Sequence, residues 1–192
     1  MNKILVDIHT HHPRPDVVSP RMAGIHPWDA ACGRDLPDFD HCDIIGETGL
    51  DYACEVDRLA QERLFRAHLV AAERLQKPVV LHMVRAFEPT IKILAEYNIA
   101  GVVFHGFIGS QQAAEALRRG YYLSFGERSL RSSKTRQAIA ATPLDRLFCE
   151  TDDDPSLDIA KVYAEVAAIK GVTLAELERY IYENYKRLFR LR

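Results

Sequence analysis

Short apolar runs alternate with amphipathic segments along most of the chain, and most of these runs end in a histidine or an acidic residue. Alternating strands and helices are typical of parallel βαβ units with right-handed crossovers. In a closed parallel barrel, functional side chains come from the loops after the carboxyl ends of the strands. The pattern therefore predicts an α/β chain whose candidate metal ligands gather at one end of a sheet. They are His9, His11, Glu47, His82, His105 and Asp152.

Strand candidates occur seven times, which favours a TIM-like (β/α) barrel that is shortened, with seven strands or with incomplete closure. Pro13 and Pro15 end the first candidate. The candidate that carries Glu47 is expected to end there and to open into a glycine-containing loop, and the candidate that carries His82 is expected to end at that residue. No βα unit fits between His11 and the next strand. The candidates cover residues 6–12, 23–29, 42–47, 78–82, 102–105, 121–126 and 146–152.

Helical periodicity predicts the segments between the strands. Apolar residues recur at helical spacing from Glu55 to Gln76, and Pro78 follows. Ser110 is expected to be the N-cap of a helix over 111–119, and Thr173 begins a capping box. Further helices are expected over residues 88–97, 132–141 and 157–169, the last closed by Gly171, and after residue 173.

The composition limits the class of protein. A length of 192 residues with 47% apolar content fits one domain over residues 1–192. The net charge of -2 argues against binding of nucleic acid by bulk electrostatics, because such binding shows a basic surplus. Four cysteines without a Cys-x-x-Cys pair indicate reduced thiols. Without a signal-peptide pattern or an apolar stretch of membrane-spanning length, we expect a cytoplasmic protein with no membrane contact.

The candidate ligands indicate hydrolytic chemistry. His9 and His11 point the same way if the segment is extended, because strand residues two apart share a face. An isolated His-x-His also fits two surface histidines, but the other candidates favour a metal site. Four imidazoles and two carboxylates exceed the needs of one tetrahedral zinc and suit two divalent ions that share a carboxylate. Such ions serve hydrolysis, and Zn, Mn, Co and Mg are all compatible with these ligands.

Several short motifs follow one another along nearly the whole chain. They are Asp7–His11, Gly24–Pro27, Ile45–Tyr52, Pro78–His82, Phe104–Phe107, Glu150–Asp152 and Asn184–Phe189. In this order they resemble the motifs of the TatD-type metal-dependent hydrolases, a family of amidohydrolase-like TIM barrels. The resemblance implies a two-metal hydrolase, a TatD-like deoxyribonuclease, with a barrel fold.

The resemblance also implies a role for each candidate. Glu47 would bridge the two ions. Asp152 would be catalytic, because it would hold one ion and orient or deprotonate the attacking water. His26, from the Gly-x-His-Pro segment, would be a second catalytic residue that contacts the substrate or the leaving group. The remaining ligands would be His9 and His11, which join Asp152 at one ion, and His82 and His105 at the other.

Departures from the family pattern concern the substrate contacts. Typical members have a helix, a strand and another helix where this chain has about a dozen residues after His11, so the chain resembles a compact variant without one βα unit. The family's arginine near His82 corresponds here to Arg85, which we expect to contact the substrate. Arg128 begins a run of cations that fits either a solvated helix start or a contact with a phosphate backbone.

The candidate ligands favour a divalent-metal-dependent hydrolase, and the resemblance implies a phosphodiesterase, specifically a deoxyribonuclease that trims single-stranded or damaged DNA ends. Two alternatives stay open. One is a two-metal hydrolase of a small amide, lactone or phosphoester. The other is a metal-holding protein that has lost catalysis.

Overall fold

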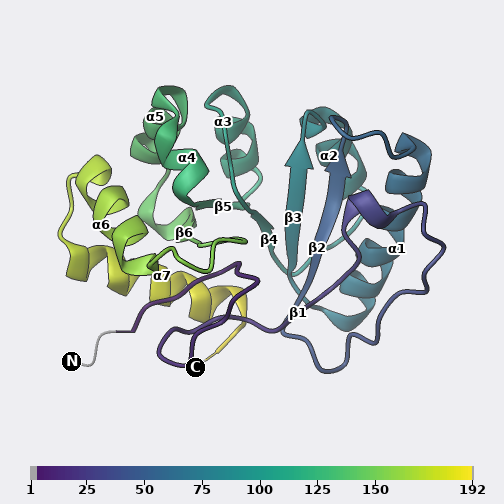
Figure 1. Cartoon of the computed structure of the whole chain (residues 1–192), viewed down its shortest axis with the longest axis horizontal. Helices are drawn as coiled ribbons and strands as arrows, with labels where there is room; N and C mark the ends of the chain where they lie inside the picture. Colours follow the sequence, from purple (N-terminus) through teal and green to yellow (C-terminus); the bar gives the residue numbers. More distant parts are fainter. Residues whose placement is uncertain (1–3, 192) are drawn as a thin grey trace. The chain divides into compact units, whose positions relative to one another are not determined.

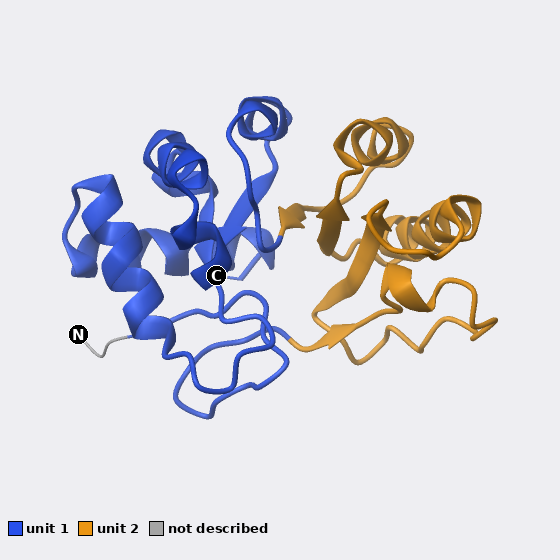
Figure 2. Cartoon of the chain, turned by 45° about the horizontal axis from the view of Figure 1, so that its top comes forward, with its two compact units in different colours: residues 1–20, 105–192 blue, residues 21–104 orange. Residues whose placement is uncertain are grey.

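A computed structural model describes residues 4–191, and Figure 1 labels its helices and strands. The chain divides into two compact units, coloured in Figure 2. Unit 1 holds the described parts of residues 1–20 and 105–192, and unit 2 holds residues 21–104. Each unit contains strands and helices, and the single domain expected over residues 1–192 stays a prediction.

Unit 2 is built on parallel strands in the order β1-β2-β3-β4. Helix α1 packs against β2, and α2 packs against β3. Buried aliphatic and aromatic side chains of these elements form the core, among them Leu50, Phe65 and Val80. The elements are β1 (Met22–Ala23), the 3-10 helix η1 (Pro27–Asp29), β2 (Ile44–Asp51), α1 (Arg58–Leu75), β3 (Val79–Val84), α2 (Phe87–Leu94) and β4 (Val102–Phe104).

Strands β2 and β3 run further than the sequence predicts. β2 continues past Glu47 to Asp51, and β3 continues past His82, so the strand ends predicted at those residues are wrong. The ladder pairs Gly49 with His82 beyond a register shift between Ile45 and Thr48. Gly49 has a φ of 137°, and a Cβ there would collide with the carbonyl oxygen of His82. Glycine therefore allows the close strand approach rather than opening a loop.

Unit 1 contains two regular strands, β5 and β6, which pair in parallel with Leu123 opposite Leu147. Helices α3 and α4 pack on β5, and α6 and α7 pack on β6. The elements are α3 (Gln111–Arg118), β5 (Tyr122–Phe125), α4 (Glu127–Arg131), α5 (Ser133–Ala141), the 3-10 helix η2 (Leu144–Arg146), β6 (Leu147–Cys149), α6 (Ile159–Lys170) and α7 (Leu174–Leu188).

The first predicted strand, over residues 6–12, does not form a regular ladder. It makes isolated parallel bridges, Val6 with Val18 and Thr10 with Asp152. Asp152 has a φ of 56°, so the extended backbone after β6 is interrupted beside this segment. The described residues therefore contain six regular strands where the sequence pattern indicates seven.

Several local predictions hold. Residues 12–21 contain no helix. The Thr173 side chain accepts a hydrogen bond from the N–H of Glu176, which is one of the two bonds of the predicted capping box, and Gly171 ends α6 with a φ of 65°. Ser110 occupies the N-cap position of α3, but its side chain makes no capping hydrogen bond. Within residues 4–191, no helix has both the length and the apolar composition needed to cross a bilayer.

Candidate metal centre

The first cluster of potential ligands lies within unit 2 and consists of His26, Glu47 and His82, whose donor atoms lie within 4.8 Å of one another. Glu47 Oε1 is 2.7 Å from His82 Nδ1 and 3.4 Å from His26 Nε2. The ring centroids of the two histidines are 4.4 Å apart. Only 9% of the Glu47 side chain is exposed. Two imidazoles and one shielded carboxylate therefore converge beside β2 and β3.

A histidine of α1 positions the backbone next to His26. The buried His68 accepts a 3.0 Å hydrogen bond at Nε2 from the N–H of Ile25, and its Nδ1 donates to the carbonyl of Leu64 at 2.8 Å. Burial lowers the pKa of His68, which suits a neutral ring with these two roles. His68 is thus a structural residue rather than a metal ligand.

Asp51, at the end of β2, lies behind His82. Its Oδ2 is 3.1 Å from His82 Nε2 and accepts a 2.7 Å hydrogen bond from the indole N–H of Trp28. Burial raises the pKa of Asp51, but hydrogen bonds from Trp28, Ala53 and His82 outweigh burial and lower it below the ordinary value. The ionised carboxylate can hold the imidazole in one orientation, as carboxylates do behind metal-binding histidines.

The second cluster lies within unit 1, where His9, His105 and Asp152 bring donor atoms within 4.8 Å of one another. Asp152 Oδ1 is 3.4 Å from His9 Nε2 and 3.9 Å from His11 Nε2. The ring centroids of His9 and His105 are 4.2 Å apart. His9 is fully buried, whereas 47% of the His11 side chain is exposed. The cluster thus has a shielded side and an open side.

Backbone hydrogen bonds fix the segment that carries His9 and His11. The Tyr163 hydroxyl on α6 accepts from the N–H of Val6 at 3.0 Å and donates to its carbonyl at 2.9 Å. The N–H of Asp152 donates to the His9 carbonyl at 3.0 Å, and the N–H of His11 donates to the Asp152 carbonyl at 2.9 Å. Both histidines are therefore held beside the Asp152 carboxylate.

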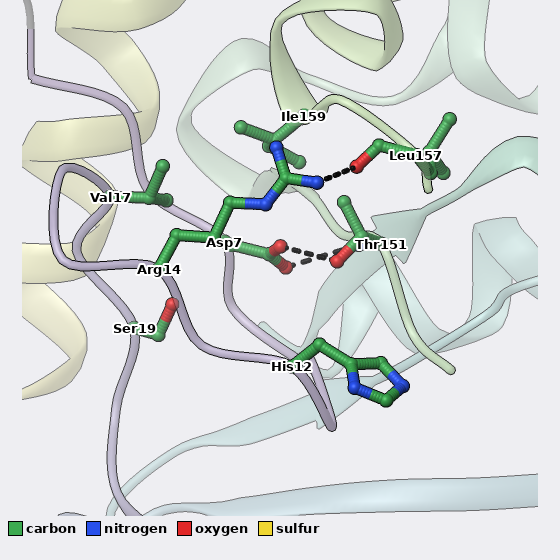
Figure 3. Close-up of a pocket in the computed structure, with 8 residues that line it drawn as sticks. All are labelled: Asp7, His12, Arg14, Val17, Ser19, Thr151, Leu157 and Ile159. Atoms are coloured by element: carbon green, nitrogen blue, oxygen red, sulfur yellow. Dashed lines mark hydrogen bonds between the residues drawn. The ribbon is translucent and has the colours of Figure 1, made fainter. Parts of the chain in front are cut away.

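A small pocket lies next to this cluster, and residues that line it hold the same segment in place (Figure 3). Asp7 accepts hydrogen bonds from the Thr151 N–H at 3.1 Å and the Thr151 hydroxyl at 2.6 Å. Burial raises the pKa of Asp7 to about 7, although both hydrogen bonds from Thr151 oppose the rise. Arg14 donates to the carbonyls of Pro155 at 3.1 Å and Leu157 at 3.2 Å. These hydrogen bonds join the N-terminal segment to the loop that carries Asp152.

Glu150 lies behind His105, in a role that the sequence pattern does not identify. It is 1% exposed, and its Oε1 is 3.4 Å from His105 Nδ1 and accepts a 2.6 Å hydrogen bond from the Gly106 N–H. Glu150 Oε2 has no hydrogen-bond partner among the described residues. A Cβ on Gly126 would lie 3.2 Å from Glu150 Cγ, so glycine leaves room for this carboxylate. The geometry suits a carboxylate that orients a metal-binding imidazole.

Replacing Glu150 with Met is expected to weaken the binding of divalent ions about 10–100-fold, the usual cost of losing a carboxylate behind a metal-binding histidine. Calorimetric titration of the folded variant with Zn²⁺ measures this. Glu150→Gln keeps the side-chain shape and an acceptor for the Gly106 N–H. This variant should therefore lose less affinity for Zn²⁺ than Glu150→Met does. Equal affinities of wild type and Glu150→Met would contradict the orienting role.

The donor chemistry of both clusters fits divalent ions. Nitrogen and oxygen ligands of one zinc lie at about 2.0–2.2 Å from the ion, and therefore within about 4 Å of each other. The separations of 2.7 and 3.4 Å in unit 2 and 3.4 Å in unit 1 satisfy this limit. Mixed imidazole and carboxylate donors suit zinc, manganese and cobalt.

The predicted ligands divide between the two units. His26, predicted as a catalytic residue and substrate contact, also joins the unit 2 cluster as a potential donor. The predicted pairing of His82 with His105 at one ion and the bridging role of Glu47 stay predictions. Of the predicted ligands, unit 1 holds His9, His11, His105 and Asp152, and unit 2 holds Glu47 and His82.

The two arginines that are predicted to contact the substrate lie in segments that follow strands. Arg85 comes directly after β3 and has a φ of 51°, and Arg128 lies on α4, which follows β5. Both side chains belong to exposed residues. Exposure leaves them accessible to a substrate, and their contacts stay predictions.

Comparison with known proteins gives a consistent result. The protein-family model described as "TatD related DNase" matches residues 11–190. The uncharacterized metal-dependent hydrolase YabD of Bacillus subtilis is 30% identical, over 88% of this chain and 76% of its own length. The human deoxyribonuclease TATDN3 is also 30% identical, over 76% of this chain and 59% of its own length.

Solved structures match the fold. The crystal structure of YJJV, a TatD homolog from Escherichia coli K12, has a TM-score of 0.85 at 22% identity and covers 98% of both chains. A TatD family hydrolase from Entamoeba histolytica has a TM-score of 0.78 at 19% identity, covering 92% of this chain and 76% of its own. These likenesses confirm the predicted fold class, a TIM-like α/β fold.

Proposed function

Because the chain belongs to the TatD related DNase family of metal-dependent hydrolases, we propose that it hydrolyses phosphodiester bonds at single-stranded or damaged DNA ends. The observation that carries the proposal is the presence of a histidine and carboxylate cluster in each unit. We further propose that the clusters hold two divalent ions drawn from Zn, Mn, Co and Mg. The name of the human relative, a deoxyribonuclease, supports DNA as the substrate.

The residues of the chain have distinct parts in the proposed reaction. A divalent ion at such a cluster supplies a Lewis acid for the phosphoryl oxygen and lowers the pKa of a neighbouring water. Asp152, whose side chain is 30% exposed, accepts the proton of the attacking water as general base. Its partial exposure lets water and substrate approach the carboxylate. Glu150 and Asp51 keep His105 and His82 in fixed orientations.

His26 can serve the leaving group. Its Nδ1 accepts a 3.2 Å hydrogen bond from the backbone N–H of Trp28, which assigns the proton of the neutral ring to Nε2. That nitrogen points to the Glu47 side of the cluster, at 3.4 Å from Glu47 Oε1. We propose that His26 donates from Nε2 to the departing oxygen. In this role His26 is not a metal ligand, and Glu47 and His82 would hold the ion of the unit 2 cluster.

Metal removal provides the test. Dialysis against EDTA is expected to abolish cleavage of an end-labelled single-stranded oligonucleotide, and Mn²⁺, Zn²⁺, Co²⁺ or Mg²⁺ should restore it, because the proposed chemistry needs a Lewis acid. A panel of small amides, lactones and phosphoesters is assayed in parallel. Turnover confined to that panel would replace the DNA assignment. Full metal occupancy without any turnover would indicate a metal-holding protein instead.

A further inference from the structure

Trp28 is the one tryptophan of the sequence, and it is 58% exposed. Tryptophan is usually well buried, so an indole with most of its surface open calls for a reason. Trp28 lies in η1, immediately after His26 and Pro27. Because it is only two residues from His26, Trp28 lies beside the unit 2 cluster.

The indole is held by its polar edge. Its Nε1 donates a 2.7 Å hydrogen bond to Asp51 Oδ2, and the Trp28 backbone N–H donates to His26 Nδ1 at 3.2 Å. The indole centroid is 4.6 Å from that of the His26 ring and 6.0 Å from that of the His82 ring. A side chain that is already positioned loses little conformational freedom when a ligand packs on it.

We propose that Trp28 is a stacking platform for the nucleobase next to the phosphodiester bond presented to His26, Glu47 and His82. The inference rests on the proposed function and assigns the substrate class that this subsite takes. Stacking on an aromatic ring is tolerant of sequence, because every base has a π face. The net charge of -2 provides little general attraction for DNA, so contacts with a base compensate for weak electrostatic binding.

The proposal distinguishes the aromatic ring from the N–H group. Trp28→Phe keeps an aromatic ring but loses the hydrogen bond to Asp51, whereas Trp28→Leu loses both. A stacking platform predicts that Phe retains most of the preference for a base and that Leu loses it. If the indole served only to hold Asp51, the Phe and Leu variants would lose the preference for a base to the same extent. That result would overturn the proposal.

The experiment uses two small probes that differ only in the base. Thymidine 3′,5′-bisphosphate and its analogue without the base are titrated into the Zn²⁺-loaded full chain, and binding is followed by calorimetry and tryptophan emission. Emission reports on this site alone, because Trp28 is the only tryptophan. We expect the thymidine compound to quench emission and the analogue to bind about tenfold more weakly. Val70→Ala, at an exposed apolar residue of α1, is the control and should match wild type.

The outcomes separate this inference from the proposed function. Trp28→Leu should bind both probes with the same affinity. Equal binding of both probes by a wild-type enzyme that cleaves DNA overturns the platform and leaves the DNA assignment standing. If wild type binds neither probe, the platform is also overturned, and if it then cleaves no oligonucleotide, the proposed function fails with it.

Discussion

Glu47→Gln is expected to lose bound metal, and by more than the roughly 10–100-fold loss of affinity that follows removal of a partner outside the ligand shell. The carboxylate faces two imidazoles, His82 at 2.7 Å and His26 at 3.4 Å, and its side chain is 9% exposed. A glutamine keeps the volume and one oxygen donor, but it removes the negative charge that offsets a divalent ion. The measurement is metal content per chain after dialysis against a defined concentration of free Zn²⁺.

The predicted bridging role makes this test sharper. If Glu47 binds both ions, the variant should lose metal from both sites, and retention of two ions would refute the bridging assignment. Glu96→Gln is a suitable control in the same unit, because Glu96 is an exposed carboxylate paired with Arg66. It should retain the wild-type metal content, since its charge serves an ion pair of the surface.

The candidate ligands that the sequence indicates gather in the two clusters of the structure, whereas the ends predicted for β2 and β3 are wrong. His105 follows β4 directly, as its position after an apolar run indicates. Glu47 and His82 instead lie inside β2 and β3, because both strands continue beyond them. Gly49 looks like a loop residue in the sequence, yet it permits close approach to the backbone of His82. A glycine that opens a loop and one that admits a neighbouring strand have the same appearance in a single sequence.

Residues that act through another side chain are harder to predict. Glu150 and Asp51 are acidic residues near predicted ligands, but only their distances to His105 and His82 reveal an orienting role. His68 occurs in a helical segment far along the chain from Ile25, whose N–H it binds. Such contacts depend on loop paths and on helix placement, and neither periodicity nor motif spacing specifies them.

Asp152→Asn is expected to reduce the rate of hydrolysis by about 10²–10⁴, the usual cost of removing a positioned general base. Asparagine keeps the shape of the side chain, but it carries no charge and cannot accept the proton of the attacking water. The backbone favours this choice of variant. Asp152 has a φ of 56°, and Asn is among the residues that best tolerate the left-handed region.

The same substitution leaves the local hydrogen bonds of the backbone in place. The N–H of Asp152 donates to the His9 carbonyl, and the Asp152 carbonyl accepts from His11, so neither bond needs the carboxylate. A loss of activity in a folded variant therefore reports on the charge and proton affinity of the side chain. Asp153→Asn is the matched control, because Asp153 is the exposed neighbour paired with His12 at 3.1 Å.

Metal content, oligonucleotide affinity and cleavage rate are to be measured on one preparation of each variant, so that a lost ion is distinguished from a lost base. We expect Asp152→Asn to change the affinity for the oligonucleotide much less than it changes the cleavage rate, because a general base acts mainly in the transition state. Asp153→Asn should keep the wild-type affinity and the wild-type cleavage rate. If Asp152→Asn retains its metal and cleaves at more than about a tenth of the wild-type rate, a loss below the range for a general base, another group must accept the proton.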